Sequence, residues 1–145
     1  MFLVAFAVVV LLATVLVRIA FSPSAAWRNA ELQAAMSRFS ENLMRARVEW
    51  MRQGEPSTML LPLTDRADTG RTVQVRVSMN HAGWPQASQP GVNGCTELWS
   101  ILAAGEQLQR ELSAQFDAVH TRCRFFYGGE EVFHFYPERG QVEKL

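Results

Sequence analysis

The sequence predicts an α+β fold in which an N-terminal transmembrane helix continues into an amphipathic helix that packs on a small antiparallel β-sheet. Three observations support this prediction. Residues 1–21 are almost entirely apolar, residues 32–50 repeat apolar side chains at helical spacing, and residues 71–80 alternate apolar and polar side chains. The chain of 145 residues therefore divides into an anchor at 1–21, an amphipathic helix at 22–54 and a globular head at 55–145.

Residues 1–21 have the length and composition of a membrane-spanning helix. Twenty helical residues rise about 30 Å, the thickness of the hydrocarbon core, whereas the apolar region of a secretory signal usually has about 7 to 15 residues. Arg18 is the only charged residue in the segment. It lies near one end, where its long side chain can reach the lipid headgroups. We therefore expect a single-pass anchor.

A cleavable signal peptide is the alternative, because the small residues 24–26 could form a peptidase site. Pro23, the missing basic segment at the start and the helical pattern that continues beyond this site argue against it. The orientation stays open. Arg18 and Arg28 follow the apolar segment, so the positive-inside rule alone would place the C-terminal part in the cytoplasm, whereas the two cysteines favour export.

The amphipathic helix follows the anchor. Ser22 and Pro23 suit its N-cap and first position, and Gly54 with Pro56 suits its end. Its apolar side chains form one stripe with a 4-3-4-3-4 spacing: Leu32, Met36, Phe39, Leu43, Ala46 and Trp50. This stripe packs either on the chain's own head, which we favour, or against neighbouring subunits. For the second case the candidate partner contacts are Leu32, Met36, Phe39, Leu43 and Trp50.

The first part of the head is predicted to contain two strands. Residues 57–63 form a short one, which Pro62 confines to a sheet edge or a strand end. Residues 71–80 form the second, with uninterrupted alternation. Residues 80–94 are rich in Gly, Pro, Asn, Gln and Ser and predict a long irregular loop, which Trp84 pins to the core.

The second part of the head is predicted to begin with a short buried helix at 95–104 and one or two further helical turns within 106–116. Residues 119–127 and 132–136 then alternate as strands on either side of a Gly-Gly pair, which is typical of a hairpin turn. A last short strand is expected at 141–144. Together these segments predict an antiparallel sheet of three or four strands.

Cys95 and Cys123 are the only cysteines, and neither belongs to a C-x-x-C pair. In a head exported to an oxidising compartment they would form a disulfide. Such a bridge would stabilise the fold by roughly 3.5 kcal/mol in the chain-entropy model. Two buried free thiols in a cytosolic head are the alternative. We expect the disulfide.

The sequence contains no catalytic or nucleotide-binding motif. His81, His120 and His134 lack the spacing of metal ligands. Acidic and basic residues number 14 each and are spread along the chain, so nucleic acid is not an expected partner. We therefore expect a non-enzymatic protein without cofactor, metal or small-molecule substrate, acting through protein contacts.

Four motifs, taken in this order, resemble the heads of type IV pilins of the mannose-sensitive haemagglutinin (MSHA) system: Gly83-Trp84-Pro85, residues 95–99, residues 123–127 and residues 135–142. The order of elements is also similar to that of pilins and pseudopilins. The resemblance implies a pilin-like fold anchored in the inner membrane, with the head in the periplasm. It also implies a role in MSHA-type pilus biogenesis, with other pilins or pilus-assembly proteins as partners.

Two features depart from the pilins that this resemblance names. Polymerising pilins are processed after a glycine and carry a glutamate at the fifth position of the mature chain, where this sequence has Ala5 and no basic leader before Met1. We therefore expect an unprocessed accessory protein of pilus biogenesis. The alternatives are a minor pilin or pseudopilin within the filament, and an exported membrane-tethered ligand-binding or enzymatic domain with the Trp84 loop as a lid.

Overall fold

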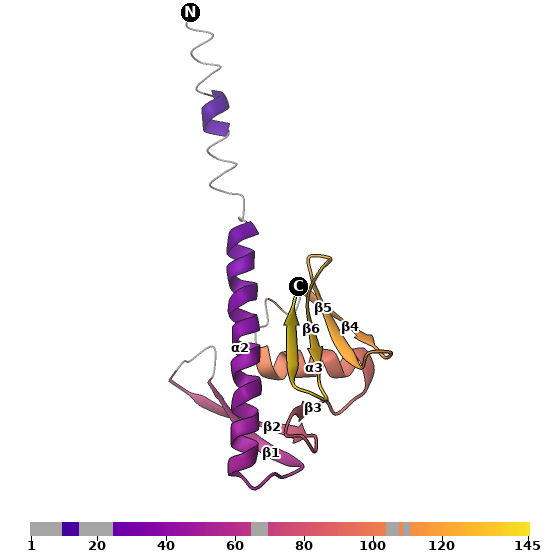
Figure 1. Cartoon of the computed structure of the whole chain (residues 1–145). Coiled ribbons are helices and arrows are strands. Elements are labelled where there is room, and N and C mark those ends of the chain that lie inside the picture. The colour runs from indigo at the N-terminus through magenta and orange to yellow at the C-terminus, as the bar shows by residue number, and fades with distance from the viewer. Residues whose placement is uncertain (1–9, 15–24, 65–69, 104–107, 109–110) are drawn as a thin grey trace, which may run out of the picture. The chain divides into compact units, whose positions relative to one another are not determined.

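The computed structural model describes residues 10–14, 25–64, 70–103, 108 and 111–145 (Figure 1). Residues 10–14 are helical, and the rest of the predicted anchor lies outside the described residues. No helix within the described ranges is both long and apolar enough to cross a membrane. The chain forms two compact units, Met1–Gln33 and Ala34–Leu145, and the contacts described below belong to the second unit.

Helix α2 (Ala25–Arg52) is the predicted amphipathic helix, whose first three predicted residues lie outside the described ranges. It ends as the sequence predicts. Gly54 adopts a φ of 82°, and the N–H of Glu55 donates to the carbonyl of Trp50 at 2.9 Å. The N–H of Gly54 donates to the carbonyl of Met51 at 3.3 Å, which completes a Schellman C-cap.

The apolar stripe of α2 lies in the chain's own core. Of the five side chains named as candidate partner contacts, the four in the second unit are at most 8% exposed: Met36, Phe39, Leu43 and Trp50. This corrects the prediction that these four contact a partner, because side chains so deeply buried leave no surface for another subunit. Leu32 belongs to the first unit, and its contact with a partner stays a prediction. From Met36 onward the stripe packs on the chain's own head, which is the alternative that we favoured.

Three strands form the first sheet, β1 (Thr58–Thr64), β2 (Thr72–Met79) and β3 (Pro85–Gln86), in the order β1-β2-β3 with antiparallel pairing. The alternation of both long strands places one face in the core: Met59, Leu61, Leu63, Val77 and Met79 are buried. Pro62 lies in β1, at the edge of the sheet, as predicted from its missing N–H.

The second sheet follows helix α3 (Gly91–Ala103). Its four strands pair antiparallel in sequence order: β4 (Leu112–Asp117), β5 (Arg122–Tyr127), β6 (Glu130–Tyr136) and β7 (Gln141–Lys144). The β5–β6 turn contains the predicted Gly-Gly pair, and both glycines have positive φ. The architecture is therefore α+β with antiparallel sheets, two of them instead of the single sheet that the sequence predicted.

An aromatic cluster joins α2, α3 and the second sheet. Phe39 of α2 stacks on Trp99 of α3 with ring centroids 5.7 Å apart, and its ring lies 5.1 Å from that of Phe135 in β6. Phe125 and Phe133 stack on each other at 4.4 Å across β5 and β6. All five rings are at most 2% exposed, so this cluster is the centre of the core.

Two cross-links tie α3 to its neighbours. The predicted disulfide is present and joins Cys95 of α3 to Cys123 of β5. At the other end of α3, the side chain of Asn42 donates to the carbonyl of Leu102 at 2.7 Å. A helix C-terminus leaves carbonyls without partners, so this bond from α2 both caps α3 and fixes it against α2.

Two predicted elements differ from the structure. Residues 112–116, predicted as helical, belong to strand β4, because β5 supplies a ladder from Leu112 opposite Tyr127 to Asp117 opposite Arg122. Val119, predicted as the start of a strand, is 86% exposed and lies in the turn between β4 and β5. In both places a long-range pairing decides a structure that the local pattern does not determine.

Candidate functional site

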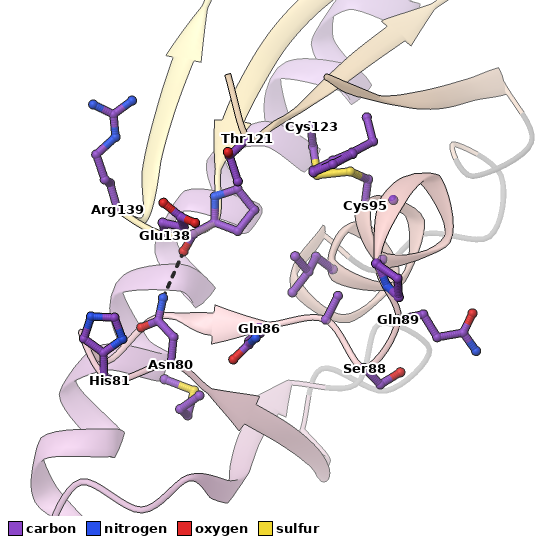
Figure 2. Close-up of a pocket in the computed structure, with 18 residues that line it drawn as sticks. Asn80, His81, Gln86, Ser88, Gln89, Cys95, Thr121, Cys123, Glu138 and Arg139 are labelled. Carbon is purple, nitrogen blue, oxygen red and sulfur yellow. Dashed lines mark hydrogen bonds between the residues drawn. A yellow bond between two sulfur atoms is a disulfide. The ribbon is translucent and has the colours of Figure 1, made fainter. Parts of the chain in front are cut away.

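A cleft of about 840 Å³ opens between the two sheets of the second unit (Figure 2). Strand β3 and the segment that leads into α3 border it on one side. The β4–β5 turn and the β6–β7 turn border it on the other, where Thr121, Glu138 and Arg139 lie. The volume falls within the range of about 300 to 1,000 Å³ that is typical of ligand sites.

The lining of the cleft combines buried apolar side chains with exposed polar ones. Met79, Leu98 and the Cys95–Cys123 disulfide are buried, and Phe116 of β4, which is 36% exposed, contributes a ring. The rim carries exposed side chains that can donate or accept hydrogen bonds: His81, Gln86, Gln89, Thr121, Glu138 and Arg139. A ligand with an apolar group and several amide or hydroxyl groups would match this arrangement.

Side-chain to backbone hydrogen bonds hold the walls of the cleft. The Oδ1 atom of Asn80 accepts from the backbone N–H groups of Ala82 and Trp84 at 3.0 and 2.9 Å, and its Nδ2 donates to the carbonyl of Pro137 at 3.3 Å. This residue therefore closes its own turn and links it to the β6–β7 turn. In the segment that leads into α3, Glu97 accepts from the N–H and the hydroxyl of Ser88 at 3.0 and 2.8 Å.

Trp84, whose N–H bonds Asn80, does not line the cleft and is only 7% exposed. The guanidinium of Arg47 lies over its ring, 4.3 Å from the centroid. Gly140 lies directly against the same ring, and any Cβ there would overlap it. The prediction that Trp84 pins its loop to the core is confirmed. A side chain packed in this way is part of the core, which argues against the alternative in which its loop acts as a lid.

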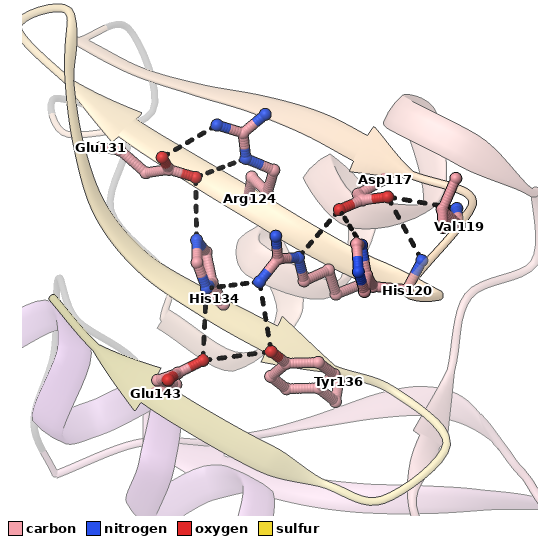
Figure 3. A network of polar contacts seen from close by, with 9 residues as sticks. Asp117, Val119, His120, Arg124, Glu131, His134, Tyr136 and Glu143 are labelled. Atoms are coloured by element: carbon pink, nitrogen blue, oxygen red, sulfur yellow. Dashed lines mark hydrogen bonds and ion pairs between the residues drawn. The ribbon is translucent and has the colours of Figure 1, made fainter.

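A second polar feature covers the face of the β4–β7 sheet opposite the aromatic core (Figure 3). His134, only 7% exposed, is the one buried charged or polar side chain within the described ranges. The NH1 group of Arg122 lies 3.1 Å from its Nδ1 atom, and Glu131 lies 2.8 Å from its Nε2 atom. Because an ionised carboxylate can only accept, the Nε2–H donates to Glu131. The Nδ1 atom faces both the Arg122 guanidinium and, at 3.3 Å, the carboxylate of Glu143.

The acidic groups of this network are held ionised. The hydrogen bonds from Arg124 and, secondly, from His134 lower the pKa of Glu131 to about 2. At the other end of the network, hydrogen bonds from His120 and Arg122 lower the pKa of Asp117 to about 2. Each carboxylate is therefore engaged with a cationic or imidazole group. Such a network ties β4, β5 and β6 together and leaves these acids poorly suited to act as proton donors near neutral pH.

The remaining sequence-predicted groups are scattered. The disulfide lines the cleft, whereas four of the five candidate partner contacts, Met36, Phe39, Leu43 and Trp50, lie in the core of the second unit. His81 is on the cleft rim, and His120 and His134 are in the polar network. Within the described part of the chain, no three His, Cys, Asp or Glu side chains are grouped so that they could hold a metal ion.

Sequence reasoning missed both the cleft and the network. In the sequence, Glu131 follows the Gly-Gly pair and Arg124 lies at an outward position of the neighbouring predicted strand. Opposite charges on the outward positions of two strands joined by a Gly-Gly turn were a usable signal for a cross-strand pair. The cleft had no such signal, because its residues come from segments far apart in the chain.

The chain matches no known protein-family model, and neither a curated protein nor a solved structure is significantly similar to it.

Proposed function

We propose that this chain is a non-enzymatic accessory protein of MSHA-type IV pilus biogenesis, anchored in the inner membrane by residues 1–21 with its head in the periplasm. One observation carries the proposal. The head packs an amphipathic helix on an antiparallel sheet through Phe39, and a disulfide links α3 to that sheet. This is the arrangement that the resemblance to MSHA pilins implies. Among proteins of that system, the motifs look most like those of the accessory component MshF.

The four motifs behind the resemblance support the proposal because they contact one another. Trp84 of the first motif packs on Gly140 of the last. The second and third motifs are joined by the disulfide between Cys95 and Cys123. Trp99 also lies with its ring centroid 5.6 Å from that of Phe125. Motifs that occur in a fixed order and also pack together indicate a pilin-like head more specifically than each motif does alone.

Action through protein contacts requires exposed surface, which the buried stripe of α2 does not supply. Another face of α2 carries Met44, Val48 and Met51, at 54%, 58% and 52% exposure. Their spacing of four and three residues places them in one row along the helix. Methionine side chains adapt to irregular surfaces, as contacts with several pilus proteins would require. We assign the contacts with other pilins or pilus-assembly proteins to this row.

The test is a deletion of the gene in the source bacterium, followed by electron microscopy of MSHA-type pili on the cell surface. We expect the pili to be lost and to return with the wild-type gene. Val48→Asp should fail to restore them, whereas Thr96→Asp, at an exposed position of α3, should restore them. Normal piliation in the deletion strain would overturn the proposal. Recovery of the protein in sheared pili would instead identify it as a filament subunit.

The membrane location is tested separately by labelling the cysteines in intact cells. With the head in an oxidising periplasm, neither Cys95 nor Cys123 should react with an alkylating agent until a reductant is added. Free reaction of both without reductant would place the head in a reducing compartment and remove the basis for this location.

A further inference from the structure

We propose that His134 is a proton-dependent switch, in which protonation of the ring moves the contact of its Nδ1 atom from Arg122 in β5 to Glu143 in β7. The C-terminal strand β7 is then held more tightly when the ring is charged than when it is neutral. The proposal rests on the hydrogen-bond geometry around the ring (Figure 3). It concerns the second unit alone and does not depend on the proposed role in pilus biogenesis.

The Nε2 atom of His134 keeps the same partner in both states of the ring. It lies 2.8 Å from a carboxylate oxygen of Glu131. Arg124 donates to both oxygens of that carboxylate, and its bonds, with the one from His134, lower the pKa of Glu131 to about 2. An ionised carboxylate can only accept, so Nε2 carries a hydrogen whether the ring is neutral or charged. Nδ1 is therefore the atom that gains or loses the proton.

The Nδ1 atom lies between two groups with opposite requirements. The NH1 group of Arg122 is 3.1 Å away and can only donate, whereas a carboxylate oxygen of Glu143 is 3.3 Å away. Hydrogen bonds from His134 and Tyr136 lower the pKa of Glu143, so this carboxylate is ionised near neutral pH and can only accept. A lone pair on Nδ1 therefore bonds Arg122 and repels Glu143. A proton on Nδ1 bonds Glu143 and repels Arg122.

Arg122 and Glu143 each keep another partner when they lose His134. The Nε of Arg122 donates to Asp117 at 3.0 Å, and its NH1 group donates to the hydroxyl of Tyr136 at 3.3 Å. The same hydroxyl donates to Glu143 at 3.1 Å. Both charges are therefore paired in either state of the ring, and the exchange avoids the cost of a buried charge without a partner.

The ring is surrounded by charged and titratable groups from all the strands packed beside it. Those that contact it or its direct partners are Arg122 and Arg124 from β5, Glu131 and Tyr136 from β6, Glu143 from β7 and Asp117 from β4. Two further groups lie beyond them: His120 bonds Asp117 at 2.8 Å, and Arg139 of the β6–β7 turn lies over the ring of Tyr136. Histidine is the side chain that most readily changes its charge near neutral pH, so a test must separate His134 from His120.

Strand β7 is the element that the exchange affects most. It has four residues, and within the described part of the chain it pairs with β6 alone, with Glu143 opposite His134. A short edge strand opens more easily than the centre of a sheet, so one charge-assisted hydrogen bond changes a large share of the free energy that holds it. Strand β5 pairs with both β4 and β6, and the loss of one contact from Arg122 affects it less.

The experiment uses the purified full-length chain in detergent micelles between about pH 5 and 8, where histidine titrates and these carboxylates stay ionised. Long-range proton–nitrogen NMR spectra of the imidazole rings show which nitrogen carries a proton, and hydrogen–deuterium exchange measures the protection of the β7 amides. As the pH falls, we expect Nδ1 of His134 to gain a proton while Nε2 stays protonated. Protection of the β7 amides, corrected for the intrinsic exchange rate, should rise about threefold or more.

Two matched pairs of variants assign the effect. Glu143→Gln removes the charge, and its amide can donate to a neutral Nδ1 as well as accept from a charged ring, so protection of β7 should no longer depend on pH. Glu138→Gln makes the same change at an exposed position of the β6–β7 turn and should leave the pH dependence intact. His134→Gln should likewise remove the pH dependence, whereas His120→Gln should retain it.

Four results would overturn the proposal. They are an Nε2 atom of His134 that lacks a proton at the upper end of the interval, a protonation state of His134 that stays constant across it, equal protection of β7 at both ends, and an undiminished pH dependence in Glu143→Gln. If a variant is unfolded, the ring spectra and the exchange of the wild-type chain still decide the outcome.

Discussion

Replacing Phe39 with alanine tests whether the apolar stripe of α2 belongs to the core of the head. The side chain is fully buried, and its ring lies within 6.5 Å of those of Trp99, Phe125, Phe133 and Phe135. Truncating a buried phenylalanine costs about 3 to 5 kcal/mol, from lost burial and from the cavity that remains. A domain of this size is typically stable by about 5 to 15 kcal/mol, so Phe39→Ala should remove a large part of the stability.

The assay is urea denaturation of the full chain in detergent, followed by tryptophan fluorescence, since Trp99 lies in the same cluster. Met44→Ala is the matched control, because Met44 is on the same helix and 54% exposed. Its free energy of unfolding should change by at most about 0.5 kcal/mol. If Phe39→Ala costs no more than this control, the stripe does not pack on the head, and its residues return as candidates for partner contacts.

Three further outcomes follow from the geometry. Reducing the disulfide, which joins cysteines 28 residues apart, should lower the free energy of unfolding by roughly 3.5 kcal/mol, measured by denaturation with and without reductant. The folded state lowers the pKa of Glu131 from 4.5 to about 2, so the stabilising contribution of this carboxylate is present above pH 4.5 and is lost as the pH falls to 2. The difference in the free energy of unfolding between wild type and Glu131→Gln should therefore shrink over that interval. Gly140→Ala should lower the melting temperature more than Gly128→Ala, since the two glycines share a φ near 60° but only Gly140 lies against Trp84. Equal shifts in the melting temperature would show that backbone conformation alone accounts for the lost stability.

The features that the sequence predicted correctly depend on local periodicity. Strand β2 alternates without a break, so its buried face follows from side-chain direction alone. The stripe of α2 likewise follows from helical spacing, and its end from the glycine at position 54, which adopts the left-handed conformation. The pairing of Cys95 with Cys123 was predictable because the chain has no other cysteine.

The features that the sequence did not predict depend on pairing between distant segments. Strand β4 has a weak pattern of its own, and it is the ladder with β5 that makes it a strand. The loop predicted at 80–94 contains β3 and the first turn of α3, whose Gly94 lies against the carbonyl of Gln89. The cleft combines this segment with two later turns. Its position therefore requires the topology of both sheets.

The residues that carry the resemblance to pilins are mainly packing residues. Trp84, Cys95, Trp99, Cys123 and Phe125 are all at most 7% exposed. A buried residue reports how the fold is stabilised, whereas recognition depends on exposed groups. The resemblance therefore bears on the fold more directly than on the partner. Under the proposed function, recognition therefore depends on exposed groups such as the row Met44, Val48 and Met51 of α2. Val48→Asp should abolish piliation without unfolding the head, whereas Phe39→Ala should lower the free energy of unfolding, so the two variants separate recognition from stability.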